Sequence, residues 1–580
     1  MNKLNKKRRQ FIFISLLIPV TLLIAFVVFP AIDLFRMSFT DWDGFSADYH
    51  FINFENYISM FHNKDLWLSL RNNAVYFVIH LFMILVELAF AVLLTSKLRA
   101  AKFYKTMVFL PYIINGVAIS YAFSYFFSPI NGAFNGILTA LHLESLIRNW
   151  LSDEKIVNFV LASVSVWRFS GYHVILFMAA LQSIPTDILE AARIDGASTG
   201  QIFQIHTDSC NHADGGLRIV RQYPRSIAGI RHSFRYDGRW SRLCFFYLYP
   251  VHHQDGVHLL ELRTGGNHGS GDHADDRDHL CDPEQDHPRS GSERQINRKD
   301  AKHMAKRVIQ QVIKQVICIG MVIIVLAPIL LTLFASLKSK GAMTLSSPLL
   351  PPAGSDLTFE NYKKVFTNKY LLIGFKNTII ILAVSLIFNV MLGTITAFII
   401  ERFEFRGKKF VVGLFFLGML IPSFVTEISR FRIINGFHLY NTLGAPIVIY
   451  IASDLMQLYI YRQFISGLSV SLDEAALLDG CSYFQLFYKI IFPLLAPATA
   501  TVCIVKAINI INDMYIPYLY MPKNKLRTIT TFLMDYANAQ QGSWQTLAAG
   551  IIVVMIPTVL TYIFFQKYIL AGIAAGAVKE

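Results

Sequence analysis

Four polar residues interrupt an otherwise apolar stretch toward the C-terminal end of the chain: Lys506, Asn509, Asn512 and Asp513. Polar and ionisable groups inside a membrane span are costly, and where they occur they commonly face a solute path or a partner group. These residues are therefore candidates for a translocation path. The alternative is that Asn512 and Asp513 lie beyond the apolar part, among lipid headgroups or in water. Asp454, in the preceding apolar stretch, is equally explained by a helix cap or a partner on a neighbouring helix.

A second group with possible chemistry is aromatic. Trp167, Tyr172 and His173 lie close together in another apolar stretch. Aromatic faces suit sugar rings, which makes Trp167 and Tyr172 candidate path residues. Aromatic residues also gather at membrane–water interfaces for reasons unconnected with any solute.

The sequence contains no recognisable catalytic site. It has no Gly-x-x-x-x-Gly-Lys-Ser/Thr phosphate loop, no zinc-protease signature and no evident nucleophile–base pair. The His and Asp residues between 268 and 279 match no common metal spacing, and the six Cys are scattered without a Cys-x-x-Cys pair. We therefore predict a protein that is not an enzyme, that does not hydrolyse ATP itself, and that has no metal or other cofactor.

Composition indicates a membrane protein. Of the 580 residues, 54% are hydrophobic and only 16% are charged, whereas soluble domains carry roughly a quarter charged residues. The formal charge of +14 does not indicate nucleic-acid binding, because no basic patch with interleaved aromatics appears. The basic residues instead flank apolar segments, as they do in the cytoplasmic loops of membrane proteins.

A helix that spans a bilayer needs about 20 mostly apolar residues. The first part of the chain offers four candidates and the second part offers six. They lie at 11–34, 74–94, 106–127 and 157–181, and at 316–337, 373–400, 410–425, 447–461, 493–511 and 547–565. The expected fold class is an all-α, polytopic transmembrane bundle.

Charge asymmetry predicts the orientation. Basic residues crowd positions 3–9, 97–105 and 402–409, which the positive-inside rule places in the cytoplasm. The N-terminus is then cytoplasmic and the segment 40–67 is external. The apolar run from residue 11 is too long for a signal-peptide core and lacks a small-residue cleavage site, so we expect it to be a retained first span.

Two short patterns occur twice. Residues 190–198 read Glu-Ala-Ala-Arg-Ile-Asp-Gly-Ala-Ser, and residues 474–482 read Glu-Ala-Ala-Leu-Leu-Asp-Gly-Cys-Ser. Residues 54–57 and 359–362 both read Phe-Glu-Asn-Tyr. Glu-Ala-Ala favours a helix and the Gly favours a break, so we predict a short helix, a sharp turn and a second helix just outside the membrane. The repeats indicate that one structural plan is used twice.

The pattern with Glu, two Ala and a Gly resembles the EAA loop of bacterial ABC importer permeases, specifically the carbohydrate-uptake type. The resemblance covers about residues 1–206 and 304–580, and it implies a MetI-like permease fold in two copies, the first incomplete. It extends to the C-terminal run of small residues at 571–579. In that family the loop docks into a cleft of a separate ATPase subunit. Carried over, it assigns ATPase coupling to Glu190, Ala191, Ala192, Asp195 and Gly196, and to Glu474, Ala475, Ala476, Asp479 and Gly480.

The resemblance also implies the partners and the location. We expect two copies of an ABC ATPase, an extracellular solute-binding protein, the lipid bilayer of a bacterial cytoplasmic membrane, and no nucleic acid. The solute would be a sugar or small oligosaccharide. Two alternatives stay open: a permease for another solute such as glycerol phosphate or a polyamine, and a membrane sensor or scaffold without flux.

Between residues 207 and 303 the composition changes abruptly to His, Asp, Arg and Gly without an apolar period. The second coupling loop, 467–495, continues into an apolar strip with a Pro, whereas the first loop breaks off after Ile205. Read one base later in degenerate codons, residues 271–280 permit an apolar sequence typical of a spanning helix. We therefore predict a reading-frame error near His206 that joins two permease genes, with domains at 1–206, 207–303 and 304–580. The alternative is a genuine hydrophilic linker; as written, the stretch is expected to be disordered.

Overall fold

The computed structural model describes residues 2–43, 48–96, 98–182, 194–196, 292–452, 455–537 and 543–577. The predicted disorder of residues 207–303 therefore lies outside the described residues as far as residue 291, as does Asp454, but for residues 292–303 it is wrong because they are helical. The described residues form helices and two isolated bridges, Thr40 with Phe51 and Lys338 with Leu357. The all-α fold class is confirmed.

The apolar runs of the first part become long helices. The first span runs through α1 (Asn2–Leu23), a π-helical turn (Ile24–Val28) and α2 (Phe29–Met37). The others are α4 (Lys64–Thr95), the pair α5 (Ala101–Ile113) and α6 (Gly116–Phe126), and α8 (Val157–Gln182). Short helices α3 (Glu55–His62) and α7 (Ala133–Ala140) lie between them. All four predicted spans have a counterpart.

The second part begins with a similar order of long and short helices and continues beyond it. It contains α12 (Ser292–Ser336), α13 (Lys340–Leu345), α14 (Glu360–Thr367), α15 (Lys369–Arg402), α16 (Lys408–Leu420) and α17 (Glu427–Gly436). It continues with α18 (Gly444–Ala452), α19 (Leu455–Ser466), α20 (Ser471–Leu478), α23 (Ala496–Asn512), α24 (Tyr515–Tyr520), α25 (Ile529–Phe532), α26 (Met534–Ala537) and α27 (Trp544–Ala577). Helix α12 begins at Ser292, inside the stretch that the sequence analysis assigned to the hydrophilic insert.

Six described helices are long and apolar enough to cross a membrane, and three bent pairs raise that number to nine. The pair α5–α6 bends by 95°, and the pair that ends in α23 bends by 73°. At the first bend, the Asn115 side chain accepts hydrogen bonds from the backbone N–H groups of Val117 and Ala118, at 2.8 and 3.2 Å. This cap starts α6 in a new direction.

The span predicted at 106–127 is divided by the 95° bend, and the span predicted at 410–425 is shorter in the structure. Residues 410–425 were expected to form a spanning helix, but α16 ends at Leu420. Residue Pro422 follows, and the residue before a proline is held away from helical backbone angles. At the α-helical rise, α16 is only about 20 Å long, and a 3-10 turn (Ser423–Thr426) leads into α17.

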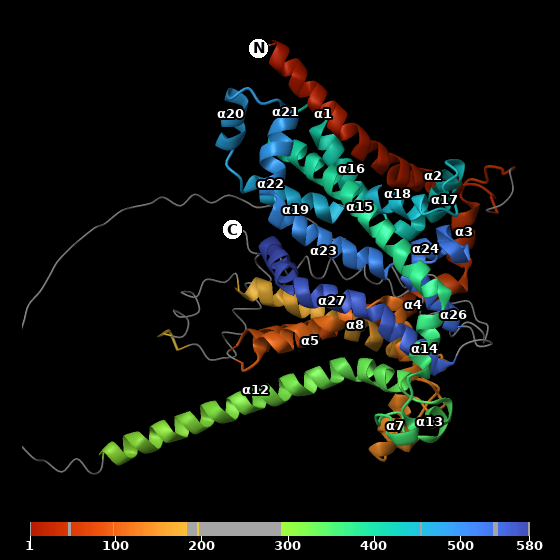
Figure 1. The fold of residues 1–580 in the computed structure, drawn as a ribbon, viewed down its shortest axis with the longest axis vertical. Coiled ribbons are helices and arrows are strands. Elements are labelled where there is room, and N and C mark those ends of the chain that lie inside the picture. The colour runs from red at the N-terminus through yellow and green to blue at the C-terminus, as the bar shows by residue number, and fades with distance from the viewer. Residues whose placement is uncertain are drawn as a thin grey trace, which may run out of the picture.

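The two parts exchange their first spans. Apolar side chains of α1, among them Phe11 and Leu16, are buried in one cluster with Phe398 of α15. Conversely, Cys318 and Val322 of α12 are buried with residues of α4, α5 and α8. In Figure 1 these two helices form opposite edges of the bundle. Helix α1 therefore packs on the second half, whereas α12 packs both on the first half and on α27 of its own half.

The ends of the bundle carry different elements. Helix α20 protrudes at one end, whereas α3, α7, α13 and α14 gather at the opposite end (Figure 1). Helix α15 connects the two, because it directly follows α14 and its last residue, Arg402, contacts Asp473 of α20. The Arg402–Asp473 contact therefore links α20 to the end of α15.

Candidate functional site

The second Glu-Ala-Ala loop folds as a helix, a sharp turn and a second helix, as predicted. Helix α20 ends in a turn that closes two backbone hydrogen bonds, from Gly480 N to Leu477 O (3.2 Å) and from Cys481 N to Ala476 O (3.0 Å). Gly480 has a φ of +85°, which costs little for glycine and more for any residue with a Cβ. Ser482 and Gln485 then cap each other and start the next helix.

The first loop is described only at its turn. Glu190, Ala191 and Ala192 lie outside the described residues, but Asp195 and Gly196 are described. Gly196 has a φ of +81°, close to the value for Gly480. Both copies of the pattern therefore use their glycine in the same left-handed conformation.

The two adjacent acids of α20 have opposite surroundings. Asp473 is buried and its carboxylate lies 3.0 Å from the Arg402 guanidinium, which also donates to the Leu468 carbonyl at 2.7 Å. Burial raises the pKa of the Asp473 carboxyl, and Arg402 opposes that rise. Glu474, in contrast, is exposed. Asp473 thus ties α20 to the end of α15, and Glu474 is available to a partner.

An apolar residue marks the tip of each loop. Leu478 is 88% exposed and Ile194 is 85% exposed, and each stands two positions before its glycine. In α20, Glu474, Ala475, Leu478 and Asp479 are all exposed, whereas Ala476 is buried. The free face of the loop therefore combines an acid, small residues and one aliphatic side chain, which suits docking into a cleft of another protein.

At the other end of α23 the two halves are joined by a pair of asparagines. Asn512 Nδ2 donates to the Ile113 carbonyl at 2.6 Å, and Asn115 Nδ2 donates to the Asn512 carbonyl at 2.7 Å. Ile113 and Asn512 are the last residues of α5 and α23, so their carbonyls have no acceptor role within their own helices. Each asparagine therefore caps a helix of the opposite half. We call this arrangement the asparagine clasp.

The other polar candidates of this region, Asp513, Lys506 and Asn509, differ in burial and in their hydrogen bonds. Asp513 accepts a hydrogen bond from the Tyr450 hydroxyl at 2.8 Å and one from Ile516 N at 3.2 Å. Lys506 is buried, whereas Asn509 is exposed on the face of α23. The predicted candidates are thus close in sequence but do not share one surface.

The aromatic candidates take part in packing. Tyr172 is buried, and its ring stacks on Tyr112 with centroids 4.8 Å apart. Trp167 packs edge-to-face on Phe123, and its indole N–H donates to the Ile324 carbonyl of α12 at 3.3 Å. Trp167 of the first half therefore contacts α12, which belongs to the second half.

Sequence reasoning missed Arg402, Asp473 and Asn115. Asp473 precedes Glu474 only in the second copy, since Leu189 occupies that position in the first, so the repeat gave no signal for it. An Asn shortly after a Pro inside an apolar segment could have indicated the cap at Asn115. Among the described residues, no group of three or more His, Cys, Asp or Glu could hold a metal ion.

Comparison with known proteins identifies the family. Residues 389–574 match the family model of the binding-protein-dependent transport system inner membrane component. The melibiose/raffinose/stachyose import permease protein MelC of Bacillus subtilis (strain 168) is 31% identical over 254 residues, which are 43% of this chain and 91% of MelC. The probable starch degradation products transport system permease protein AmyC of Thermoanaerobacterium thermosulfurigenes is 29% identical over 255 residues, 44% of this chain and 92% of AmyC.

A solved structure was also matched, a bacterial ABC transporter involved in the import of the acidic polysaccharide alginate. It is 22% identical, with a TM-score of 0.41, and the match covers 46% of this chain and 97% of that one. The family assignment depends instead on the sequence relatives, of which MelC is matched over nine tenths of its length. This chain belongs to the inner-membrane components of binding-protein-dependent transport systems, the permease subunits of ABC importers.

Proposed function

We propose that the protein forms the membrane path of an ABC importer for a sugar or small oligosaccharide. The observation that carries the proposal is the free face of α20, where exposed Glu474 and Leu478 flank a turn fixed by Gly480. Separate ATPase subunits would dock there and on the first loop, one on each. The solute class is supported by the names of MelC and AmyC, which refer to oligosaccharides and starch products.

The orientation follows from the same proposal. The coupling loops and the N-terminus would lie in the cytoplasm, and α3, α7, α13 and α14 would face outward, where an extracellular binding protein delivers the solute. ATP binding would draw the two loops together, and α15 would transmit the movement through the Arg402–Asp473 contact.

Within the membrane we propose Asn509 as the residue that faces the path. Residues 496–509 of α23 cover about 20 Å from the loop side, at the α-helical rise, which places Asn509 well inside the hydrocarbon layer. At that depth, an exposed polar side chain has a much lower free energy in contact with water than in contact with lipid. Asn512, Asp513, Tyr172 and Trp167 would then hold the wall of the path rather than line it.

We also propose the division into a first permease at 1–206, an insert at 207–303 and a second permease at 304–580. MelC and AmyC each match over nine tenths of their own length within less than half of this chain. That ratio fits two permeases joined end to end. The abrupt change of composition after residue 206 is the reason to examine the gene for a reading-frame error.

Docking can be tested by charge reversal. The tagged protein is purified from its own host and the co-purifying ATPase is identified by mass spectrometry. Glu474→Lys should lower the ATPase yield roughly tenfold, because an attractive charge becomes repulsive at a docking surface. Glu154→Lys, an exposed acid outside the loop, is the matched control. Equal ATPase yield from both variants would remove the docking role.

The solute class needs a separate measurement. Host cells that carry the intact gene cluster are compared with cells deleted for this gene. We expect uptake of labelled raffinose or maltotriose to be lost on deletion, and uptake of labelled spermidine and glycerol phosphate to be unchanged. The reverse pattern would replace the sugar assignment with one of the other solutes, and no change for any of them would favour a sensor without flux.

A further inference from the structure

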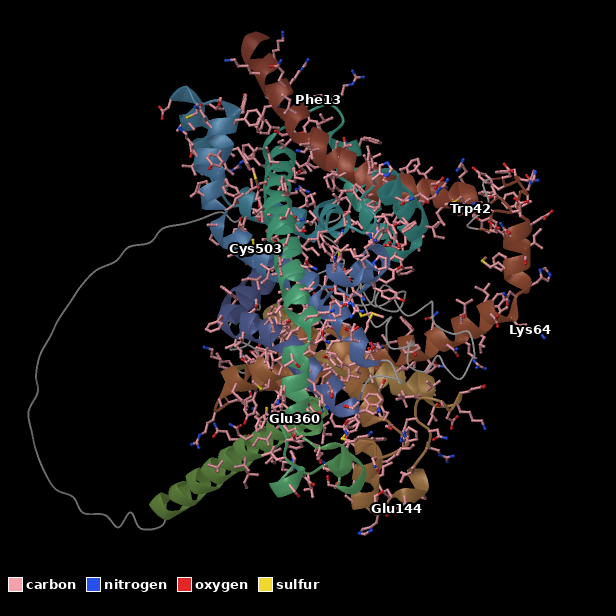
Figure 2. The ribbon with its side chains drawn as sticks, turned by 45° about the vertical axis from the view of Figure 1, so that its right-hand side comes forward. Phe13, Trp42, Lys64, Glu144, Glu360 and Cys503 are labelled. Carbon is pink, nitrogen blue, oxygen red and sulfur yellow. The ribbon has the colours of Figure 1, made fainter. Side chains whose placement is uncertain are left out.

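The Phe-Glu-Asn-Tyr repeat builds the same small unit twice. In each half a short helix, α3 or α14, begins at the Glu of the repeat and lies between the first and second spans. Both helices lie at the end of the bundle opposite α20 (Figure 1). Figure 2 labels Lys64, at the corner where α3 meets α4, and Glu360, the first residue of α14. The coupling loops do not account for this second repeat.

Each short helix is fastened to the end of the first span of its own half. The Tyr57 hydroxyl lies 2.7 Å from Ser38 Oγ, and the Tyr362 hydroxyl lies 2.7 Å from Ser336 Oγ. The asparagine of the repeat donates to two carbonyls at the same place. Asn56 reaches those of Ser38 and Thr40 at 3.0 and 2.8 Å, and Asn361 reaches those of Ser336 and Lys338 at 2.9 and 3.0 Å. The depth of the short helix in the membrane is therefore set by the span.

One edge of each short helix carries two exposed phenylalanines. Phe54 and Phe61 are 63% and 57% exposed, and Phe359 and Phe366 are 67% and 61% exposed. Residues seven apart lie on one face of a helix, and the asparagine of the repeat lies on the opposite face. Both copies thus keep the same apolar edge free, although most of the other positions in the two helices differ.

The spans place this edge near the boundary between hydrocarbon and headgroups. Residues 11–32 of the first span are apolar and cover roughly 33 Å at the α-helical rise, close to the thickness of a hydrocarbon layer. Ser38 is then about 9 Å beyond the hydrocarbon, at headgroup level. Residues 316–336 of α12 cover a similar length, so Ser336 lies at the hydrocarbon boundary itself.

In the first unit the exposed aromatic surface is continuous with that of the span. Phe35 is exposed on α2, its ring lies 5.2 Å from that of Phe39, and the ring of Phe39 lies 5.4 Å from that of Phe54. Phe35 lies just beyond the apolar run 11–32, so this row of rings leads from the lipid boundary onto α3. In the second unit, Lys363 is exposed on α14, four residues after Phe359, where it can meet lipid phosphates.

We propose that α3 and α14 are interfacial helices whose phenylalanine edges enter the bilayer in the leaflet opposite the coupling loops. A short amphipathic helix with aromatic residues on one face binds in this way, with that face buried a few ångström below the headgroups. The two helices anchor the far ends of the exchanged first spans to lipid. The inference depends on a membrane-spanning permease but not on the solute or the ATPase.

The test uses a photoreactive phenylalanine analogue, p-benzoyl-phenylalanine, at position 54 and, separately, at position 359. The matched controls carry it at Ser59 and Lys364, exposed positions on the polar side of the same helices. The full-length protein is placed in nanodiscs of phosphatidylethanolamine and phosphatidylglycerol in equal parts, irradiated and analysed by peptide mass spectrometry.

We expect lipid adducts at 54 and 359 that exceed those at the controls by about fivefold or more, since the apolar face alone enters the lipid. Equal adduct levels at the two faces, or none at 54 and 359, would overturn the proposal. So would irradiation in cells that links these positions to a binding protein instead of lipid. Because a variant could assemble poorly, a second measurement uses a nitroxide spin label attached at Phe366→Cys. If this label collides more often with a water-soluble nickel reagent than with lipid-soluble oxygen, the proposal is equally refuted.

Discussion

The asparagine clasp should contribute measurably to stability, and Asn512→Ala is its cleanest perturbation. The substitution removes the 2.6 Å hydrogen bond to the Ile113 carbonyl and a longer one, 3.4 Å, from the Thr558 hydroxyl. It leaves the Asn512 backbone carbonyl in place, so Asn115 keeps its own acceptor. The buried Ile113 carbonyl then loses its side-chain donor, which should lower the free energy of unfolding by about 1–2 kcal/mol in a membrane protein.

Asn115→Ala should cost more, because Asn115 has two roles. It loses the bond to the Asn512 carbonyl and also the cap on α6, where it accepts from Val117 and Ala118. A helix cap contributes about 1 kcal/mol, so the expected total is about 2–3 kcal/mol. The two bonds hold the same backbone segments together, and the double variant should therefore lose less than the sum of the single variants, by roughly 0.5–1.5 kcal/mol.

The assay is thermal unfolding of the purified protein in detergent. At roughly 1 °C per kcal/mol for a chain of 580 residues, Asn512→Ala should lower Tm by about 1–2 °C and Asn115→Ala by about 2–3 °C. Asn509→Ala is the matched control, because Asn509 is one turn away on α23 and exposed; its Tm should change little. The argument for the clasp fails if Asn512→Ala has the same Tm as Asn509→Ala. It also fails if the stability losses of Asn512→Ala and Asn115→Ala add up to that of the double variant.

Four further predictions concern the loop, the topology and the gene. Gly480→Ala should lower Tm through backbone strain alone, by about 1–2 kcal/mol, because φ is +85° and no atom lies near the added Cβ; unchanged Tm would contradict this. Arg402→Ala should destabilise the protein by about 2–3 kcal/mol by leaving Asp473 buried and unpaired. The pKa of Asp473, already raised by burial, then rises further. The folded state therefore binds a proton more readily than the unfolded state, and the loss of stability should shrink as the pH falls through the raised pKa of Asp473; a loss that is independent of pH would refute the charge argument. Topology reporters near Ala100 and Lys408 should report cytoplasm, with reporters near Ser46 and Ala353 on the other side, and inversion at any two sites would overturn the orientation. Resequencing the DNA around codon 206 should reveal a reading-frame error, whereas one unaltered frame through Met304 and a single full-length product would establish a genuine linker.

Sequence alone was sufficient for features that depend on neighbouring residues. The spans followed from the length of apolar runs, and the helix and turn of the coupling loop followed from Glu-Ala-Ala and the later glycine. Even there a single residue decided the outcome, since Pro422 shortened a predicted span to α16. Such local features need no knowledge of what packs against them.

Features that depend on distant contacts could not be derived in this way. Nothing in residues 11–32 indicates that α1 packs against α15 of the other half, because an apolar face fits many partners equally well. The same holds for Asn512, which composition made a candidate path residue and which proved to donate to a carbonyl far away in the sequence. Asp473 and Glu474 are adjacent acids in the sequence. Only the position of Arg402 in the structure shows that Asp473 forms an internal ion pair while Glu474 stays exposed.

The two halves of the chain resemble each other more closely at the ends of the bundle than in its middle. The proposed function offers a reason for this difference. At one end both copies turn through a glycine at φ +81° and +85°, and at the other both short helices are held by the same asparagine and tyrosine contacts. Between these ends the halves differ: α5 and α6 meet at a capped 95° bend, whereas α16 stops before a proline and continues through a 3-10 turn. The ends would meet partners that come in equivalent pairs, two ATPases on one side and the same lipid surface on the other. A sugar has no two-fold axis, so the middle of the path gains nothing from symmetry, and residues such as Asn509 are free to differ between the halves.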